Sequence, residues 1–201
     1  AGWRYLAITH FGAALVIAAL AYLAVSSGEV RLSEMRGLSA LIGPGASAAV
    51  VIMLFLGFGS KLGLLPFHIW MPDLYSRSSS TVTALLSTAA SNVAVLVFVR
   101  VTFSCVGVEG QYALSLTVMG LAALTALWAS WQALVQRDGA RVLAFSSMEN
   151  MGLILLTMGA AMLFRAYGAA EPAAFALMAA LFHLINHTVF KALLLMGAGT
   201  V

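Results

Sequence analysis

The chain has 201 residues, of which 62% are hydrophobic and 8% are charged, whereas soluble domains carry about 25% charged residues. This composition excludes an ordinary soluble protein and predicts an integral membrane protein, and the single cysteine, Cys105, excludes an internal disulfide. The formal net charge of +3 comes from ten scattered Lys and Arg residues without a basic cluster, so no nucleic-acid partner is predicted.

Long apolar runs separated by short polar breaks predict helices, because the strands of a membrane barrel would alternate polar and apolar residues. The expected spans are 5–25, a second from residue 46, 81–101, 112–135, 142–164 and a last one from residue 172. The fold class is therefore all-α, a polytopic transmembrane helix bundle of about six spans that forms a single domain over 1–201. The final residues still belong to an apolar run, so the chain is expected to be part of a longer protein.

The first two spans are joined by a polar loop, 26–45, which ends in a Gly-Pro-Gly break. The second span then changes character in the segment GFGSKLGLLPFHIWMPD, where Gly and Pro are dense enough to break a helix near Lys61. Broken backbone at membrane depth is tolerated where it is buried in protein or lines a wet cavity. Lys61 would lie roughly 22 Å into the membrane core, and the alternative is a lysine at a helix end whose stem covers apolar surface.

The third span carries small and polar side chains at helical spacing, namely Thr83, Ser87, Ser91 and Asn92. Such spacing is typical of close helix packing with side-chain hydrogen bonds. Ser87, Asn92 and His68 are candidates for holding water or for packing. A tight charged turn, QRDGAR, leads from the fourth span into the fifth.

The last span contains the segment FHLINHTVFK, in which His183, His187 and Lys191 are four residues apart. On an α-helix this spacing keeps all three on one face. A charge at a bilayer centre costs about 3 kcal/mol on insertion scales, so such residues normally face a bundle interior or a hydrated cavity and mark an ion or proton path. The alternative is that both histidines are neutral, hydrogen-bonded core residues and that Lys191 extends to the membrane surface.

Together with Lys61 and Glu149 of the fifth span, this face predicts proton transfer between buried ionisable groups. Successive groups are about 6 Å apart in helical rise, too far for a direct hydrogen bond, so a relay needs water. Two other chemistries remain open. His-x-x-x-His could hold a metal ion, although the motif has no Glu and no third ligand near it, and a broken helix could form a solute site.

The segments GFGSKLGLLPFHIWMPD, RVLAFSSMENMGLILL and ALFHLINHTVFKALLLMGAG, in this order, resemble the antiporter-like proton-conducting subunits of complex I, multisubunit sodium/proton antiporters and membrane-bound hydrogenases. The SSMENMG form and the first residues, AGWRYLAITHFG, are most similar to the formate hydrogenlyase subunit 3 and hydrogenase-4 component B branch. The resemblance covers nearly the whole chain.

The resemblance implies a longer chain with two inverted repeats and a hydrated row of Lys, His and Glu. It implies that Lys61 is a key proton-carrying group and that His183, His187 and Lys191 line the link between two half-channels. It further implies partner membrane subunits, no bound cofactor, no chemistry of its own, transport of protons or sodium, and the cytoplasmic membrane of a bacterium or archaeon. Loop charges leave the orientation open, whereas the resemblance makes the turn at 137–141 cytoplasmic.

The sequence departs from the branch at Asn92, where a lysine is usual. The link between Lys61 and the histidines therefore lacks a titratable group. A diverged structural scaffold that has lost transport is the competing interpretation.

Overall fold

A computed structural model describes residues 2–198, and every regular element in this range is a helix. Six helices or helical runs are long and apolar enough to cross a membrane, which confirms the predicted all-α bundle. The α-helices are α1 (Gly2–Ser27), α2 (Ser39–Leu62), α3 (Met71–Tyr75), α4 (Ser80–Leu85), α5 (Ser91–Val99), α6 (Tyr112–Val135), α7 (Gly139–Ala166) and α8 (Ala170–Ala198). A 3₁₀ turn, η1 (Phe67–Trp70), precedes α3, and π-helical turns, η2 (Leu86–Ala90) and η3 (Arg100–Val106), precede and follow α5.

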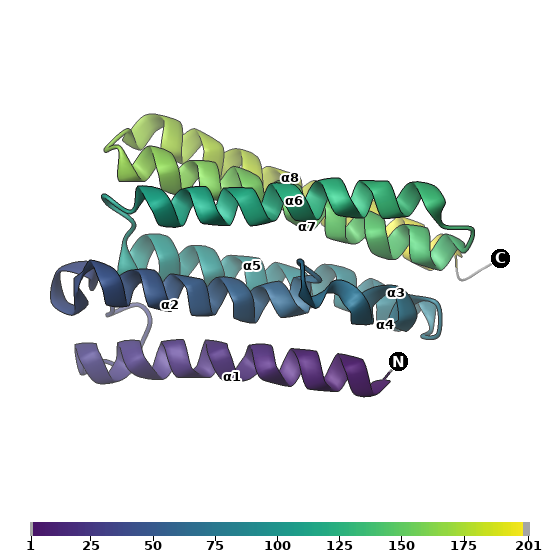
Figure 1. Cartoon of the computed structure of the whole chain (residues 1–201), viewed down its shortest axis with the longest axis horizontal. Helices are drawn as coiled ribbons and strands as arrows, with labels where there is room; N and C mark the ends of the chain where they lie inside the picture. Colours follow the sequence, from purple (N-terminus) through teal and green to yellow (C-terminus); the bar gives the residue numbers. More distant parts are fainter. Residues whose placement is uncertain (1, 199–201) are drawn as a thin grey trace.

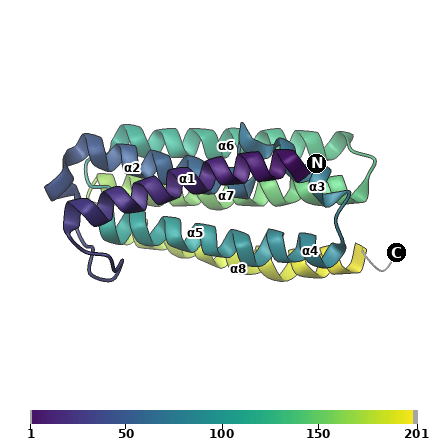
Figure 2. The ribbon, with the colours of Figure 1, turned by 90° about the horizontal axis from the view of Figure 1, so that it is seen from below.

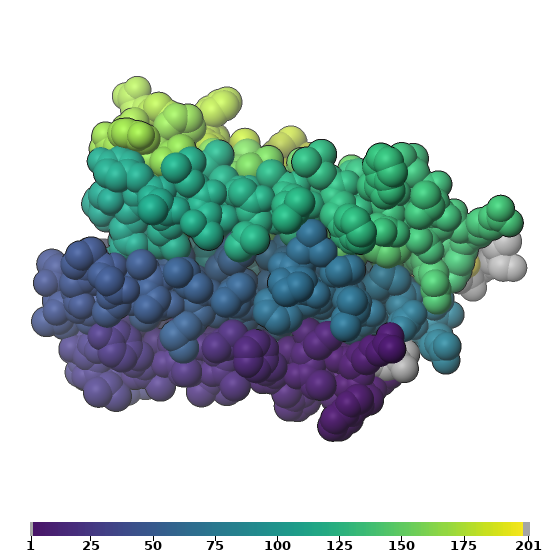
Figure 3. Space-filling view, in the orientation of Figure 1, coloured from purple at the N-terminus to yellow at the C-terminus, as the bar shows by residue number. Residues whose placement is uncertain are grey.

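The helices run along the long axis of the bundle, with α1 at one edge beside α2 and with α6, α7 and α8 on the other side (Figure 1). Seen from below, α8 lies alongside α4 and α5 (Figure 2), and it also packs against α7. The space-filling view shows α1 in purple along one side of the molecule and α6 in green along the opposite side (Figure 3). The last helix is thus held between two neighbours, α7 and the run from α4 to α5.

The loop before the second span is shorter than the sequence predicts. Helix α2 begins at Ser39, and its first turn is separated from the rest by a kink at Gly43, whose φ of 77° and ψ of 165° are not helical. Pro44 follows and starts the continuous helix, as expected for a residue whose fixed φ suits a first turn. The early turn forms because Leu38 donates its backbone N–H to the Cys105 carbonyl at 2.8 Å, which ties this segment to η3.

The predicted break near Lys61 is present. Helix α2 ends at Leu62, and Gly63 follows with a left-handed φ of 74° that residues with a side chain rarely adopt. The chain then passes through η1 into α3. Trp70 donates its Nε1–H to the Ser60 carbonyl at 2.9 Å, so the second segment is fixed against the end of the first.

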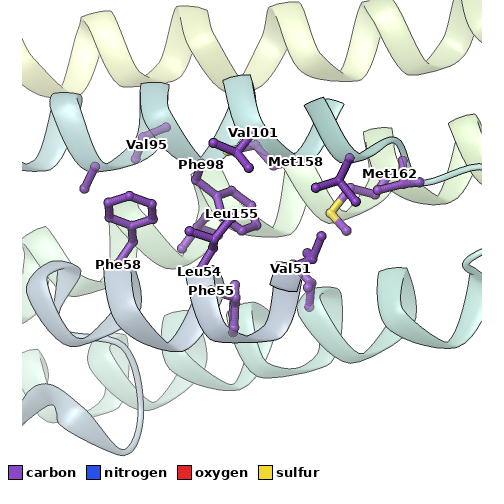
Figure 4. Close-up of a cluster of buried hydrophobic side chains, with 14 of the residues drawn as sticks. Val51, Leu54, Phe55, Phe58, Val95, Phe98, Val101, Leu155, Met158 and Met162 are labelled. Atoms are coloured by element: carbon purple, nitrogen blue, oxygen red, sulfur yellow. The ribbon is translucent and has the colours of Figure 1, made fainter. Parts of the chain in front are cut away.

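An apolar cluster fills the space between α2, α5 with η3, and α7 (Figure 4). Its drawn and labelled members are Val51, Leu54, Phe55, Phe58, Val95, Phe98, Val101, Leu155, Met158 and Met162. All are hydrocarbon or thioether side chains, so this part of the bundle stabilises the fold by apolar burial.

One end of the bundle is joined by ion pairs to Asp73 on α3, and we call it the Asp73 end. The Asp73 carboxylate lies 3.3 Å from Arg4 on α1 and 3.3 Å from Arg141 on α7. At the opposite end Arg165 pairs with Glu109 at 3.0 Å. The second half of the broken helix is therefore tied to both of its neighbours.

Candidate functional site

Lys191 is the most deeply placed cation of the chain. Its side chain has 0% exposure, because α8 turns this face towards α7 and α4. Its Nζ donates to the Leu143 carbonyl at 3.2 Å and lies 5.8 Å from the Phe190 ring centroid. Lys191 therefore does not extend to the surface, which contradicts that alternative.

Within residues 2–198, no carboxylate forms an ion pair with Lys191. Glu149, half-buried on α7, acts on the Lys191 charge only over a longer distance. The Glu149 side chain makes no hydrogen bond or ion pair in the part of the chain that the structure describes. An ammonium in such a place is stabilised by one carbonyl and by the distant carboxylate, far less than water would provide.

His187, one turn before Lys191, is also fully buried. Neither of its ring nitrogens has a hydrogen-bond partner among the described residues, and its ring packs edge-on against Phe190 with centroids 5.4 Å apart. A hydrogen-bonded core histidine, the alternative raised by the sequence, is therefore not what the structure contains at this position. Unpaired polar atoms in a protein interior are costly, and in native proteins they usually mark a water site or a functional group.

His183, one turn earlier, is half-buried and does have a partner. Its Nε2 lies 3.0 Å from Oδ1 of Asn150, whose Nδ2 donates to the Ser146 carbonyl at 2.7 Å. Because an amide oxygen only accepts, this arrangement assigns the proton of a neutral His183 to Nε2. The sequence places Asn150 next to Glu149, but the spacing alone does not identify which of the two faces α8.

Lys61 is not brought together with the face of α8. Its side chain is exposed on the side of the described bundle and makes no hydrogen bond or ion pair with residues 2–198. It lines a cavity of about 50 Å³ together with Tyr5, Thr9, Trp70, Leu86 and Ala90. Two of these residues belong to η2, which also packs against α8, so η2 stands between Lys61 and the last helix.

Asn92 contacts α8 directly. Its amide nitrogen lies 2.9 Å from Oγ1 of Thr188, the residue that follows His187. The expected side-chain hydrogen bonding of the third span is thus present at this position. Thr188 also donates to the Leu184 carbonyl at 2.8 Å within its own helix.

Ser87 forms a second polar cluster with Ser147 and Tyr75. Of these three residues, the sequence identifies only Ser87 as a candidate. Its Oγ lies 3.0 Å from Oγ of Ser147 on α7, and both side chains are buried. Ser147 in turn donates to the Leu143 carbonyl at 3.0 Å, the same oxygen that accepts from Lys191. The Tyr75 hydroxyl lies close to both serines without forming an aligned hydrogen bond.

His68 lies in η1 and is half-buried. Its ring packs edge-on against Trp128, with centroids 6.5 Å apart, and its Nδ1 is buried without a hydrogen-bond partner within the described range. The structure thus gives His68 a packing contact and leaves one nitrogen for another partner. Across residues 2–198, no group of three or more His, Cys, Asp or Glu side chains is arranged to hold a metal ion.

The model of the family described as "NADH:quinone oxidoreductase/Mrp antiporter, TM" matches residues 1–201. An uncharacterized protein of Mycobacterium tuberculosis is 39% identical over 201 residues, covering 100% of this chain and 31% of the relative. Hydrogenase-4 component B of Escherichia coli is 34% identical over 202 residues, covering 100% of this chain and 30% of the relative.

Among solved structures, one chain of the Mrp complex from Dietzia sp. superimposes with a TM-score of 0.81 at 20% identity, covering 98% of this chain and 34% of that chain. At this identity the likeness shows the fold. The present chain spans less than a third of the length of the two sequence relatives described above.

Proposed function

This chain belongs to the NADH:quinone oxidoreductase/Mrp antiporter transmembrane family, and we propose that it moves protons across a membrane as one subunit of a redox-driven assembly of the membrane hydrogenase or NADH:quinone oxidoreductase type. Other subunits would carry out the redox chemistry. The contribution of this chain would be a path of buried ionisable groups. The protein is an integral, multi-pass membrane protein. We propose that its membrane is the cytoplasmic membrane of a bacterium or archaeon.

The observation that carries this proposal is the burial of Lys191 without a carboxylate partner among residues 2–198. Replacing buried charged groups with apolar side chains of similar volume is often neutral or stabilising, so stability does not explain an isolated lysine here. A lysine that exchanges its proton with neighbouring groups does explain it. We therefore assign Lys191 as the central exchange site.

His187 and His183 are the proposed relays. They lie one helical turn apart on the same face of α8 as Lys191. Each group lies about 6 Å from the next along the helix, beyond hydrogen-bond reach, so water must join them. The two ring nitrogens of His187 are suited to such water, because neither has a hydrogen-bond partner among the described residues. Glu149, half-buried on α7, is proposed as a further proton-transfer group of this path.

Lys61 is proposed as the proton-loading group, on the basis of its place at the end of the first half of the broken helix. Its ammonium has no partner in the described range and faces outward. We propose that this face is covered by another segment or subunit of the assembly. Moving one charge across 100 mV requires about 2.3 kcal/mol, so the driving energy must come from a partner or from a second ion gradient, such as sodium.

A structural scaffold without transport remains a second candidate, and Asn92 favours it. The Asn92 amide is hydrogen-bonded to Thr188 of α8. An amide does not carry a proton from the Lys61 side to α8 as a titratable lysine at this position could. In a scaffold, the buried groups would persist without moving protons.

Replacement of Lys191 in the full-length protein within its complex separates the two candidates. We expect Lys191→Met to reduce proton uptake by inverted membrane vesicles at least about tenfold, with the complex still assembled. Lys191→Arg should fail as well, because a guanidinium does not release its proton. Arg36→Met, in the exposed first loop, is the control that should retain uptake. Normal uptake by both Lys191 variants would establish the scaffold instead.

A further inference from the structure

An apolar groove lies between η3 and the start of α8, at the end of the bundle opposite Asp73. Its volume is about 200 Å³, and it is lined by Phe103, Arg165, Ala170, Ala173, Ala174 and Leu177. Helix α8 packs against α4, η2 and α7, whereas its contacts with η3 are sparse. The groove is therefore the space that remains between two helical runs where α8 presents small alanine side chains.

The walls of this groove suit a hydrocarbon chain. Five of the six lining residues are apolar, and Arg165 is the one charged group among them. On neighbouring positions of α8, Phe175 and Met178 are 74% and 66% exposed, as expected where a transmembrane helix faces lipid. An acyl chain in the groove would contact both helical runs at once, and van der Waals packing is what drives association inside a bilayer.

Two tyrosines indicate the depth of the groove in the membrane. The rings of Tyr112, at the start of α6, and Tyr167, directly after α7, pack with centroids 4.7 Å apart, and both side chains are exposed. Tyrosine is enriched at the level of the lipid headgroups, because its ring is apolar and its hydroxyl group binds water. Arg165 is two residues before Tyr167, so its guanidinium lies at the headgroup level while Leu177 lies nearer the membrane core.

Arg165 has hydrogen-bond donors left for a ligand at this level. Its Nε donates to Glu109 Oε1 at 3.0 Å, and the N–H groups on its two Nη atoms have no partner among residues 2–198. Arg100, three residues before Phe103 in η3, is exposed and forms no ion pair in the described range. A guanidinium matches phosphate oxygens in charge and in the spacing of its donors. The groove thus combines an apolar floor with a mouth that fits a phosphate group.

We propose that this groove binds one phospholipid, with its phosphate on the Nη atoms of Arg165 and one acyl chain along Phe103 and Leu177. Glu109 pairs with Arg165, and Glu171 lies in the first turn of α8, so carboxylates offset the positive charge near the mouth. The recognised feature is therefore the phosphate diester that all glycerophospholipids share, and not a net negative headgroup. The lipid would join η3 to α8 where the two runs contact each other little.

The occupant of the groove can be identified by cross-linking. In the full-length protein within its complex, we introduce Leu177→p-benzoylphenylalanine, wash the complex in detergent and irradiate it. We expect mass spectrometry to find a phospholipid joined at this position. Leu127→p-benzoylphenylalanine, on the exposed side of α6, should give no lipid adduct, because lipid outside a groove is washed away. A peptide joined at position 177, or the absence of an adduct, would overturn the proposal.

The role of Arg165 is tested by lipid affinity, measured by native mass spectrometry with phosphatidylethanolamine added to the delipidated complex. We expect Arg165→Gln to weaken binding at least about tenfold, the effect of one lost hydrogen bond to a charged group. Diacylglycerol with the same chains should bind the unaltered protein as weakly. Arg31→Gln is the matched control, since Arg31 is an exposed arginine that also pairs with a glutamate. Undiminished binding by Arg165→Gln, or equal binding of diacylglycerol, would overturn the phosphate site.

The acyl-chain part of the site is tested by filling the groove. Ala174→Phe should displace the lipid, because a phenyl ring would occupy the groove, whereas Ala21→Phe, at an exposed position of α1, should not. Full lipid binding by Ala174→Phe would contradict an acyl chain in this groove. None of these experiments measures proton uptake, so the lipid site and the proposed function can fail independently.

Discussion

Oγ1 of Thr188 on α8 lies 2.9 Å from Nδ2 and 3.0 Å from Oδ1 of Asn92 on α5. A hydroxyl group has one proton, and the Leu184 carbonyl at 2.8 Å competes for it, so Thr188 accepts from Nδ2 when it donates to its own helix. Either arrangement fixes α5 against α8 beside His187. The link between α5 and α8 is therefore uncharged, although the resemblance predicts a lysine at position 92.

The Asn92–Thr188 link should be measurable as a coupling energy. We expect Asn92→Ala and Thr188→Val to be non-additive by about 0.6 kcal/mol, the average for hydrogen bonds between transmembrane helices. The measurement is a double-mutant cycle on the free energy of unfolding in detergent or bicelles. Asn92→Ala combined with Thr117→Val should be additive, because Thr117 bonds only within α6. Additivity of the first pair would show that the contact contributes nothing.

Replacing His187 with an apolar residue should preserve or raise stability while it lowers proton uptake. We expect His187→Leu to leave the free energy of unfolding unchanged or to raise it by about 1 kcal/mol, because two unpaired nitrogens are removed. Proton uptake should fall by at least about tenfold, since the proposed relay loses a member.

His10→Leu is the control for His187, because its ring lies on an exposed position of α1. It should retain proton uptake. Normal uptake by His187→Leu would remove this histidine from the proposed path.

Two glycines provide a matched test of helix packing. A Cβ added at Gly152 on α7 would lie 2.8 Å from the Ala126 nitrogen and 2.9 Å from the Ala122 oxygen, both backbone atoms of α6. Gly152→Ala should therefore destabilise the protein by about 1–3 kcal/mol. Gly120→Ala, whose Cβ meets nothing within 4 Å, should be neutral or stabilise by up to about 1 kcal/mol. Thermal unfolding of the two variants gives the comparison, and equal midpoints would contradict the close approach of α6 and α7.

The ion pairs of Asp73 should make a small, salt-dependent contribution to the free energy of unfolding. Its pairs with Arg4 and Arg141 are 3.3 Å long and partly exposed, so Asp73→Asn should cost at most about 1 kcal/mol. The difference should shrink in 1 M salt, where the Debye length is about 3 Å. Unfolding midpoints at low and high salt measure it, and Glu34→Gln, which breaks an exposed pair within the first loop, is the control. A loss that persists in 1 M salt would indicate a buried role for Asp73.

The path between Lys61 and α8 could not be derived from residue spacing. Both the broken helix and the four-residue spacing of His183, His187 and Lys191 are local features, and the structure contains the break and the helix as expected. However, Lys61 faces outward, and η2 lies between it and α8. The rotation of α2 about its own axis decides which way Lys61 faces. No pattern of neighbouring residues specifies that rotation.

The sequence by itself determined the number of spans, the break near Lys61 and the shared face of α8, because span length, the density of Gly and Pro and the 3.6-residue period are properties of neighbouring residues. Only the tertiary structure decided that Lys191 binds the Leu143 carbonyl, that His183 meets Asn150 and that Ser87 meets Ser147. These partners are 48, 33 and 60 residues apart. Their contacts depend on how far each helix is shifted and turned against the next, which the packing of whole helix surfaces sets.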